Sequence, residues 1–242
     1  MCISNEREVQ LLEFQKKYNL KFENLELLNQ AFIHTSYTNE SNLDVLGSYE
    51  RLEFLGDAVL KLSISSLLFE KFNDYKEGEL TKLRAEIVSD KFIFEFAKKL
   101  DFENLIVLGR NEKKHGGAKK ESILACAFEA LLGAIFIEYK NEGYKKAKEF
   151  LVENFNDEIL NINTQINRLN PKASLQEYTQ SINHKLPEYI LVEETGLAHD
   201  RTFFVEVKFQ DEIIGKGSAK SIKNAQQEAA FDALKNLGIM EK

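Results

Sequence analysis

Residues 49–69 read YERLEFLGDAVLKLSISSLLF, and this stretch decides how the chain is interpreted. Wound as a helix, it is apolar over most of its circumference, and a helix of that kind is normally buried. Glu53 and Asp57 nevertheless occur inside it, four residues apart, which places both carboxylates on one face about one turn apart. Because like charges so close together destabilise each other, the pair predicts a bound cation or a positively charged neighbour.

A second apolar segment repeats this feature. Ile123–Ile137 contains a single charged residue, Glu129, and an ionised carboxylate in such surroundings needs a partner or a metal ion. Oxygen ligands without zinc-spaced His or paired Cys favour Mg²⁺, with Mn²⁺ as the alternative. From spacing alone, buried salt bridges to an arginine such as Arg51 or Arg84 explain the acids equally well.

The first 160 residues show helical periodicity and no strand pattern. Helices are predicted at Glu8–Tyr18, Asn24–Ile33, Tyr49–Phe72, Glu121–Tyr139 and Tyr144–Leu160, with one or two more in Thr81–Leu100. A loop, LGRNEKKHGGAKK, is expected at residues 108–120. These features predict an all-α domain over residues 1–160.

The remaining residues have a different character. Residues 161–170, NINTQINRLN, are polar and lack an apolar period, which predicts a linker. In the segment FFVEVKF every second side chain from Phe203 to Phe209 is apolar, typical of a half-buried strand. The expected elements are a helix at Lys172–Ile182, strands at Pro187–Glu193, Thr202–Phe209 and Glu212–Ala219, and a helix at Ser221–Leu237. Residues 171–242 are therefore predicted to form a small α+β domain in the order α-β-β-β-α.

Composition restricts the function classes. The net charge of −7 and the pI of about 5.4 weigh against nucleic-acid binding unless basic residues are segregated on one face. Two distant cysteines, Cys2 and Cys126, indicate a reducing setting rather than a disulfide scaffold. The polar N-terminus is unlike a signal peptide, and no apolar run reaches the roughly 18 residues of a membrane span. A cytoplasmic protein without membrane partners is expected.

Residues 49–60, YERLEFLGDAVL, closely resemble the signature of the ribonuclease III family, which usually has Asn in place of Tyr49. Weaker blocks follow in the family's order, namely LLNQAFIHTSY, EGELTKLRAEIVS, the HGG loop and ESILACAFEALLGAIFIE. The segment from residue 171 resembles the family's double-stranded-RNA-binding domain, so the resemblance covers essentially the whole chain. It implies an all-helical endonuclease domain that forms a homodimer, followed by that RNA-binding domain.

The resemblance also implies a catalytic centre. Glu53, Asp57 and Glu129 would bind Mg²⁺, with Mn²⁺ as the alternative, and Cys126 stands at a fourth metal-site position. Asp57 and Glu129 would be the catalytic residues, and no small-molecule cofactor is implied. Glu50 matches a family acid near the RNA-binding valley of the dimer, although capping or local pairing explains it nearly as well. The implied reaction is hydrolysis of double-stranded RNA by two metal ions, giving 5′-phosphate and 3′-hydroxyl ends in rRNA and mRNA processing.

One position departs from the family pattern inside this site. The family has Asp three residues before the last catalytic Glu, and this chain has Cys126, which the spacing directs toward the same face as Glu129. Cys is a poor ligand for Mg²⁺. Three alternatives follow. Cys126 packs while a water completes the metal shell and activity is retained, or the site is weakened and its metal preference altered. In the third, the chain is a catalytically silent double-stranded-RNA-binding protein that acts in ribosome assembly or RNA regulation. Because all three acids are retained, we expect an enzyme.

The C-terminal segment carries candidate RNA ligands on the same resemblance. They are Gln176, Gln180, His199, Lys216, Lys220 and Lys223, the lysines lying in the motif GKGSAKSIKNAQQEAA. Neutral amides suit 2′-hydroxyl groups, and a helix N-terminus with nearby lysines suits phosphates. The motif usually has a second adjacent Lys where this chain has Ile222, and Gln226 replaces a residue that is often basic, so weaker phosphate binding is expected. Alternatively, these lysines are only a solvated helix start and the domain contacts proteins.

Overall fold

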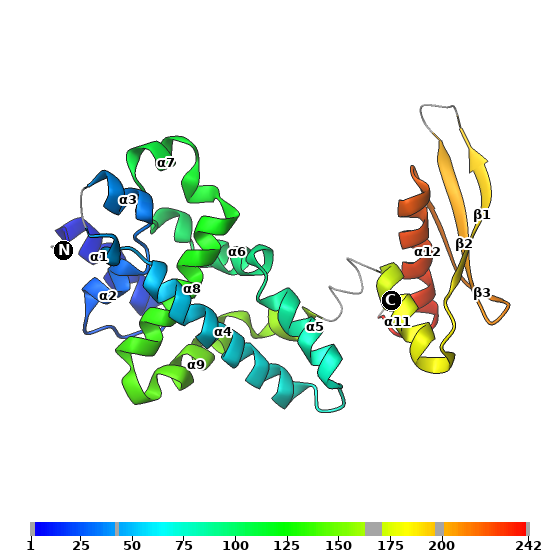
Figure 1. Cartoon of the computed structure of the whole chain (residues 1–242), viewed down its shortest axis with the longest axis horizontal. Coiled ribbons are helices and arrows are strands. Elements are labelled where there is room, and N and C mark those ends of the chain that lie inside the picture. The colour runs from blue at the N-terminus through cyan, green and yellow to red at the C-terminus, as the bar shows by residue number, and fades with distance from the viewer. Residues whose placement is uncertain (1–2, 42–43, 163–170, 197–200, 241–242) are drawn as a thin grey trace. The chain divides into compact units, whose positions relative to one another are not determined.

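The structure is a computed structural model that describes residues 3–41, 44–162, 171–196 and 201–240. The chain forms two compact units, Met1–Leu160 and Asn161–Lys242, which we call the helical unit and the α/β unit (Figure 1). Ile162, which falls in the predicted linker, is fully buried, and residues 163–170 of that linker lie outside the described residues. No helix in the described ranges has the length and apolar character needed to cross a membrane.

The helical unit confirms the predicted all-α domain. Its helices are α1 (Asn5–Lys17), α2 (Leu25–Gln30), α3 (Thr35–Glu40), α4 (Glu50–Lys71), α5 (Glu77–Ile87), α6 (Asp90–Lys99), α7 (Arg110–Lys114), α8 (Glu121–Glu138) and α9 (Gly143–Leu160). The predicted segment Thr81–Leu100 is divided at Ser89, whose hydroxyl accepts a hydrogen bond from the Phe92 amide and caps α6. Helices α3 and α7 were not predicted, because they are too short to show an apolar period.

Helix α8 is the centre of the helical unit, and its residues are buried over most of their length. Aromatic rings from neighbouring helices close around it: Phe96 of α6 stacks on Phe155 of α9 with ring centroids 4.0 Å apart, and Phe128 of α8 lies 5.7 Å from Phe155. Helix α4 crosses α8 at two glycines, Gly56 of α4 and Gly133 of α8. A Cβ atom on Gly133 would stand 2.2 Å from the Leu52 carbonyl oxygen. This close crossing brings the backbones of α4 and α8 together.

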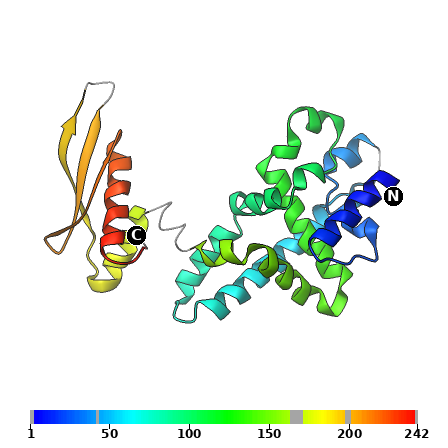
Figure 2. The ribbon, with the colours of Figure 1, turned by 180° about the vertical axis from the view of Figure 1, so that it is seen from behind.

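Helix α4 differs from the prediction that an almost wholly apolar helix is buried. Phe54 is 83% exposed and Phe69 is 73% exposed, and both lie with Leu62 along one face of the helix. Figure 1 shows α4 at the front of the helical unit with no element in front of it, and the reverse view in Figure 2 places it on the far side. One face of α4 packs on α8 and another apolar face remains uncovered.

The α/β unit has the predicted order α-β-β-β-α and confirms that part of the fold. It consists of α11 (Pro171–Asn183), β1 (Glu188–Thr195), β2 (Thr202–Phe209), β3 (Glu212–Ala219) and α12 (Ile222–Asn236). The strands form an antiparallel sheet in the order β1-β2-β3. Val205 and Val207 are buried on one face of β2, as the alternating pattern predicted.

Two glycines determine how closely α12 lies on the sheet. A Cβ atom on Gly217 would stand 2.2 Å from the Ala229 amide nitrogen, and one on Gly215 would stand 2.4 Å from the Ala229 carbonyl oxygen. Ala225 and Ala233, one turn to either side of Ala229, are likewise fully buried. Small residues on both surfaces therefore fix the position of α12, and with it the helix N-terminus that follows β3.

Candidate functional site

The predicted acids converge where α4 crosses α8. Glu53 and Asp57 extend from successive turns of α4, Glu129 extends from α8, and all three side chains are half-buried. A fourth acid, Asp90 at the start of α6, acts electrostatically on Glu53 and on Glu129. Asp90 was not predicted as a site residue, because an acid in the first turn of a helix is ordinarily explained by the helix dipole.

Burial and the charges of neighbouring acids disfavour the ionised forms of Glu53 and Glu129. Burial raises the pKa of Glu129 to about 7, and the neighbouring charges of Asp57, Glu53 and Asp90 act in the same direction. Burial also raises the pKa of Glu53, which a hydrogen bond from the Cys126 side chain partly offsets. Half-buried carboxylates with raised pKa values, such as Glu53 and Glu129, are stabilised in their charged form by a cation placed beside them.

Cys126 extends from α8 into this cluster and hydrogen bonds with Glu53. Burial, followed by the charge of Glu53, raises the pKa of the Cys126 thiol to about 12, so the thiol is neutral and donates to the carboxylate. Tyr49, the other departure from the signature, is buried within electrostatic reach of Cys126. The two departures from the family pattern therefore lie within electrostatic reach of each other and of Glu53.

Salt bridges to the two arginines do not account for the acids. Arg84 donates a hydrogen bond from Nη1 to Ser65 Oγ at 3.1 Å, and Asp57 instead accepts one from Lys61 Nζ at 2.7 Å. In the described part of the chain, neither Glu53 nor Glu129 forms an ion pair with Arg51 or Arg84. The alternative that sequence spacing left open is thus not the arrangement in this structure.

The donor set suits a hard divalent cation, although its side chains are not gathered around one point. Among the described residues, no three His, Cys, Asp or Glu side chains stand close enough together to hold an ion as they are. Asp57 is engaged by Lys61, whose ammonium group donates a hydrogen bond to its carboxylate. Crowded carboxylates without an arginine partner fit Mg²⁺ or Mn²⁺, with the thiol of Cys126 as a neutral neighbour.

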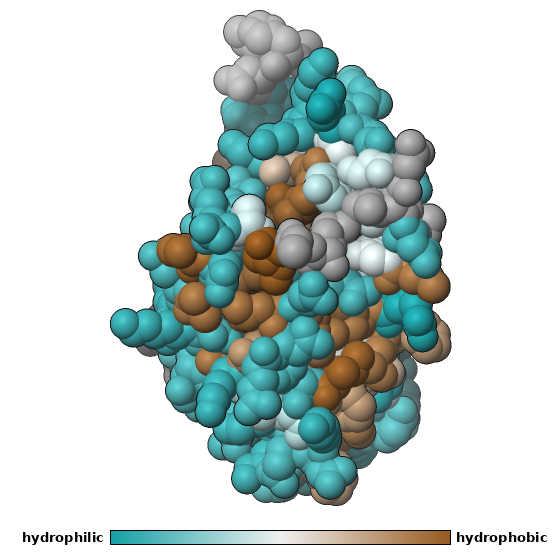
Figure 3. All heavy atoms as spheres, turned by 90° about the vertical axis from the view of Figure 1, so that its left-hand side faces the viewer, coloured by the Kyte–Doolittle hydropathy of each residue, from teal (hydrophilic) through white to brown (hydrophobic). Residues whose placement is uncertain are grey.

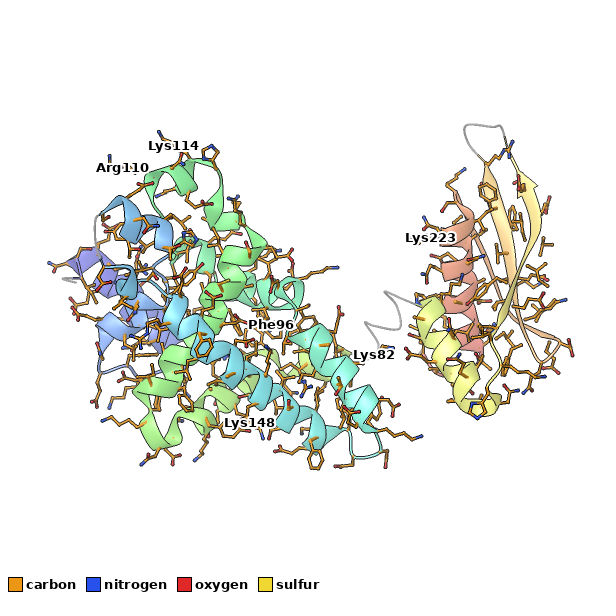
Figure 4. All side chains as sticks on the ribbon, in the orientation of Figure 1. Lys82, Phe96, Arg110, Lys114, Lys148 and Lys223 are labelled. Atoms are coloured by element: carbon orange, nitrogen blue, oxygen red, sulfur yellow. The ribbon has the colours of Figure 1, made fainter. Side chains whose placement is uncertain are left out.

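In the α/β unit, several of the predicted RNA ligands are exposed, on α11 and near the start of α12. Gln176 and Gln180 are exposed one turn apart on α11, beside the buried Leu175 and Thr179. Lys223 is exposed in the first turn of α12, where the Ser221 hydroxyl accepts from the Asn224 amide and caps the helix (Figure 4). Lys220 is exposed immediately before this cap, and His199 lies outside the described residues.

The structure separates Lys216 from this group. Gly215 and Gly217 face α12, so Lys216 between them points to the opposite face of the sheet. Its ammonium group forms an ion pair with Glu206 of β2 at 2.8 Å, and the two residues are register partners. The expectation that Lys216 clusters with Lys220 and Lys223 is therefore corrected by the strand alternation, which sequence proximity alone conceals.

A basic surface in the helical unit had also been missed. The segment at α7 and just after it carries Arg110, Lys113, Lys114, Lys119 and Lys120 against a single acid, Glu112. Figure 4 shows Arg110 and Lys114 projecting outward from α7. The Glu40 carboxylate accepts from the amides of Arg110 at 2.7 Å and Asn111 at 3.0 Å, which anchors the start of the helix. In an acidic chain, this segregated charge is the signal that sequence analysis could have used.

Comparisons with known proteins find a matching family model for each of the two units. A family model described as Ribonuclease-III-like matches residues 24–159, and the double-stranded RNA binding motif matches residues 171–237. The chain is 42% identical to Ribonuclease 3 of Enterococcus faecalis, covering 93% of this chain and 96% of the relative. It is 40% identical to Ribonuclease 3 of Natranaerobius thermophilus, covering 94% and 96%.

A solved structure resembles the helical unit. The nuclease domain of ribonuclease III from Campylobacter jejuni aligns with a TM-score of 0.53 and 36% sequence identity, covering 60% of this chain and 97% of that domain. The description of that structure refers to structural flexibility in a region involved in dimer formation. This likeness concerns the unit that contains the acid cluster.

Proposed function

The chain belongs to the ribonuclease III family and is a double-strand-specific endoribonuclease, and we propose that Glu53, Asp57 and Glu129 form its divalent-metal catalytic centre. The observation that carries this proposal is the crowding of these half-buried acids at the crossing of α4 and α8. Retaining such a cluster costs stability, because burial and mutual repulsion both disfavour its charged form. Binding of a metal ion would offset this loss of stability by neutralising the acids.

The acids have separate tasks in this proposal. Asp57 and Glu129, on facing helices, hold the charge that positions Mg²⁺ or Mn²⁺, and Glu53 supports them from the preceding turn of α4. When bound, a divalent ion lowers the pKa of a coordinated water and stabilises charge on the phosphate. The close packing of α4 on α8 fixes the carboxylates relative to each other. Products with 5′-phosphate and 3′-hydroxyl ends are expected.

We propose that Cys126 is compatible with catalysis. The neutral thiol donates a hydrogen bond to Glu53 and so orients that carboxylate without adding a further charge. The three other acids of the centre are retained. The competing possibility, a silent nuclease domain on a double-stranded-RNA-binding protein, rests on the loss of one oxygen ligand at this same position.

Duplex RNA is held by both units in this proposal. In the α/β unit, Gln176 and Gln180 on α11 and the lysines at the start of α12 provide amides and positive charge. In the helical unit, Arg110 and Lys114 provide exposed positive charge. These groups suit the 2′-hydroxyls and phosphates of A-form RNA, which is bound mainly through its shape and backbone. Residues 161–170, between the two matched regions, would act as a linker.

We further propose that the protein is a homodimer formed through the exposed apolar face of α4. Phe54, Leu62 and Phe69 are 83%, 58% and 73% exposed, an arrangement that monomers in water avoid. An isologous contact between two copies would bury this face in both. Figure 3 shows that apolar side chains are also exposed on another side of the helical unit, so the test must be specific to α4.

The proposed role is processing of rRNA and mRNA precursors in the cytoplasm. The decisive assay incubates the full chain with a long RNA duplex and a single-stranded control, in Mg²⁺ and in Mn²⁺, beside the Glu129→Gln variant. We expect the wild type to cut the duplex alone, and the variant to bind duplex in Ca²⁺ without cutting it. Cleavage by Glu129→Gln at the wild-type rate would reject the site. No wild-type cleavage in either metal would favour the silent binding protein.

A further inference from the structure

Lys61 is paired with one acid of the cluster and acts electrostatically on another, Glu129. Its ammonium nitrogen is 2.7 Å from Asp57 Oδ2, one turn earlier on α4. The side chains of Lys61 and Asp57 are 52% and 38% exposed, so the contact is half open to solvent. An ordinary ion pair with this spacing and exposure contributes little to helix stability.

The surroundings distinguish this pair from an ordinary one. Asp57 is one member of a group that includes Glu53, Glu129 and Asp90, and Lys61 is the cation whose charge acts on Glu129 against them. The pair therefore supplies positive charge at the place where the proposed metal centre needs it. Among the described residues the acids are not gathered around a common point, and Asp57 is already engaged by an ammonium group.

We propose that Lys61 is a built-in counterion that competes with the divalent metal ion for Asp57 and thereby sets the metal affinity of the site. This inference rests on the proposed metal centre and deepens it. In the metal-free protein, Lys61 neutralises part of the cluster. Before Asp57 can bind a divalent ion, the ammonium group of Lys61 must leave the Asp57 carboxylate. The Lys61 side chain is half-exposed, so it can turn into solvent.

The charge of Lys61 also acts after it has left Asp57. A unit positive charge roughly 6 Å from a divalent ion, in surroundings close to the dielectric constant of water, weakens binding of that ion about tenfold. Replacing Lys61 by the neutral Gln removes both the competing contact and this repulsion. The metal-free protein then loses its counterion, so its stability should fall, and bound metal should restore it.

The test measures Mn²⁺ binding to the full chain without RNA, by electron paramagnetic resonance of the free ion. The variants are Lys61→Gln, Glu129→Gln and Lys146→Gln. Lys146 is the matched control, because it forms an ion pair with Glu149 at the same 2.7 Å, with side chains 40% and 38% exposed, on α9. Thermal unfolding with EDTA and with saturating Mn²⁺ provides a second readout.

We expect Lys61→Gln to bind Mn²⁺ about tenfold more tightly than the wild type, with Lys146→Gln unchanged. In EDTA, Lys61→Gln should unfold at a lower temperature than Lys146→Gln, and Mn²⁺ should remove the difference. Equal or weaker Mn²⁺ binding by Lys61→Gln, while Glu129→Gln loses binding, would overturn the inference about Lys61 alone. Binding that is unaffected by Glu129→Gln would overturn the metal centre itself, and the role of Lys61 with it.

Discussion

Gly56 of α4 lies so close to Glu129 of α8 that a Cβ atom on Gly56 would stand 1.7 Å from the Glu129 carbonyl oxygen. No side chain fits at this position without moving one helix away from the other. Gly56 directly precedes Asp57, so the point of closest approach is also the point at which the acids of α4 and α8 meet. The fold and the candidate centre depend on the same contact.

Gly56→Ala should therefore damage both stability and activity. The added methyl group must push α4 from α8, at a cost of about 3 kcal/mol in the free energy of unfolding, and the displaced acids should lower the cleavage rate. Denaturant unfolding and duplex cleavage are the measurements. Gly78→Ala in α5 is the control, because a Cβ atom there meets nothing within 4 Å. Equal stability of the two variants would contradict the close crossing.

Cys126→Asp should lower the stability of the metal-free protein and strengthen its binding of metal. A carboxylate at this position removes the hydrogen bond donated to Glu53 and adds a like charge beside it, so unfolding in EDTA should occur more readily. In Mg²⁺ the extra oxygen ligand should lower the concentration that gives half-maximal cleavage. Cys126→Ser keeps a neutral donor and should behave like the wild type. An unchanged Mg²⁺ dependence in the Asp variant would show that residue 126 lies outside the metal shell.

The raised pKa of Glu129 predicts a pH dependence of stability. Burial, reinforced mainly by Asp57, raises this pKa to about 7, whereas an unperturbed Glu has a pKa of about 4.3. Between these values the folded protein keeps a proton that the unfolded chain releases, so stability should fall as pH rises through this window. In EDTA the decline should be steeper for the wild type than for Glu129→Gln. Parallel pH profiles would show that Glu129 titrates normally.

Binding of duplex RNA should depend on the start of α12. Lys223→Gln should weaken binding in Ca²⁺ by about fivefold and reduce the slope of affinity against salt by about one, because one phosphate contact is lost. Ile222→Lys should have the opposite effect. Lys235→Gln, near the other end of α12 with its ammonium 4.4 Å from the Phe231 ring centroid, should leave the salt slope unchanged. Equal effects of Lys223→Gln and Lys235→Gln would indicate nonspecific charge attraction only.

The uncovered face of α4 should control the oligomeric state. Phe54→Glu places a charge on the most exposed apolar side chain of this face, which should halve the mass measured by light scattering while helix content is retained. Ile182→Glu in the α/β unit is the control, since Ile182 is 52% exposed on a different unit and should not affect assembly. A dimer that survives Phe54→Glu would place the interface elsewhere.

The sequence by itself determined the division into an all-α and an α+β part and the helices that carry Glu53, Asp57 and Glu129. It could do so because periodicity and residue spacing are local properties, and one helix fixes the relative directions of its own side chains. The same local logic identified the strand alternation around Val205 and Val207. Very short helices such as α3 and α7 left no such signal.

Only the tertiary structure determined which surfaces of the helices and strands pack against one another and which remain uncovered. It brought Asp90 near the cluster, left Phe54 uncovered and set the glycine-bearing face of β3 against α12, so that Lys216 lies on the far face of the sheet. Each of these facts depends on which surface of an element is covered by another, and that choice is made by packing between residues distant in sequence. Backbone contacts at Gly56 and Gly217 set those surfaces, because they fix how closely two elements approach and in which orientation.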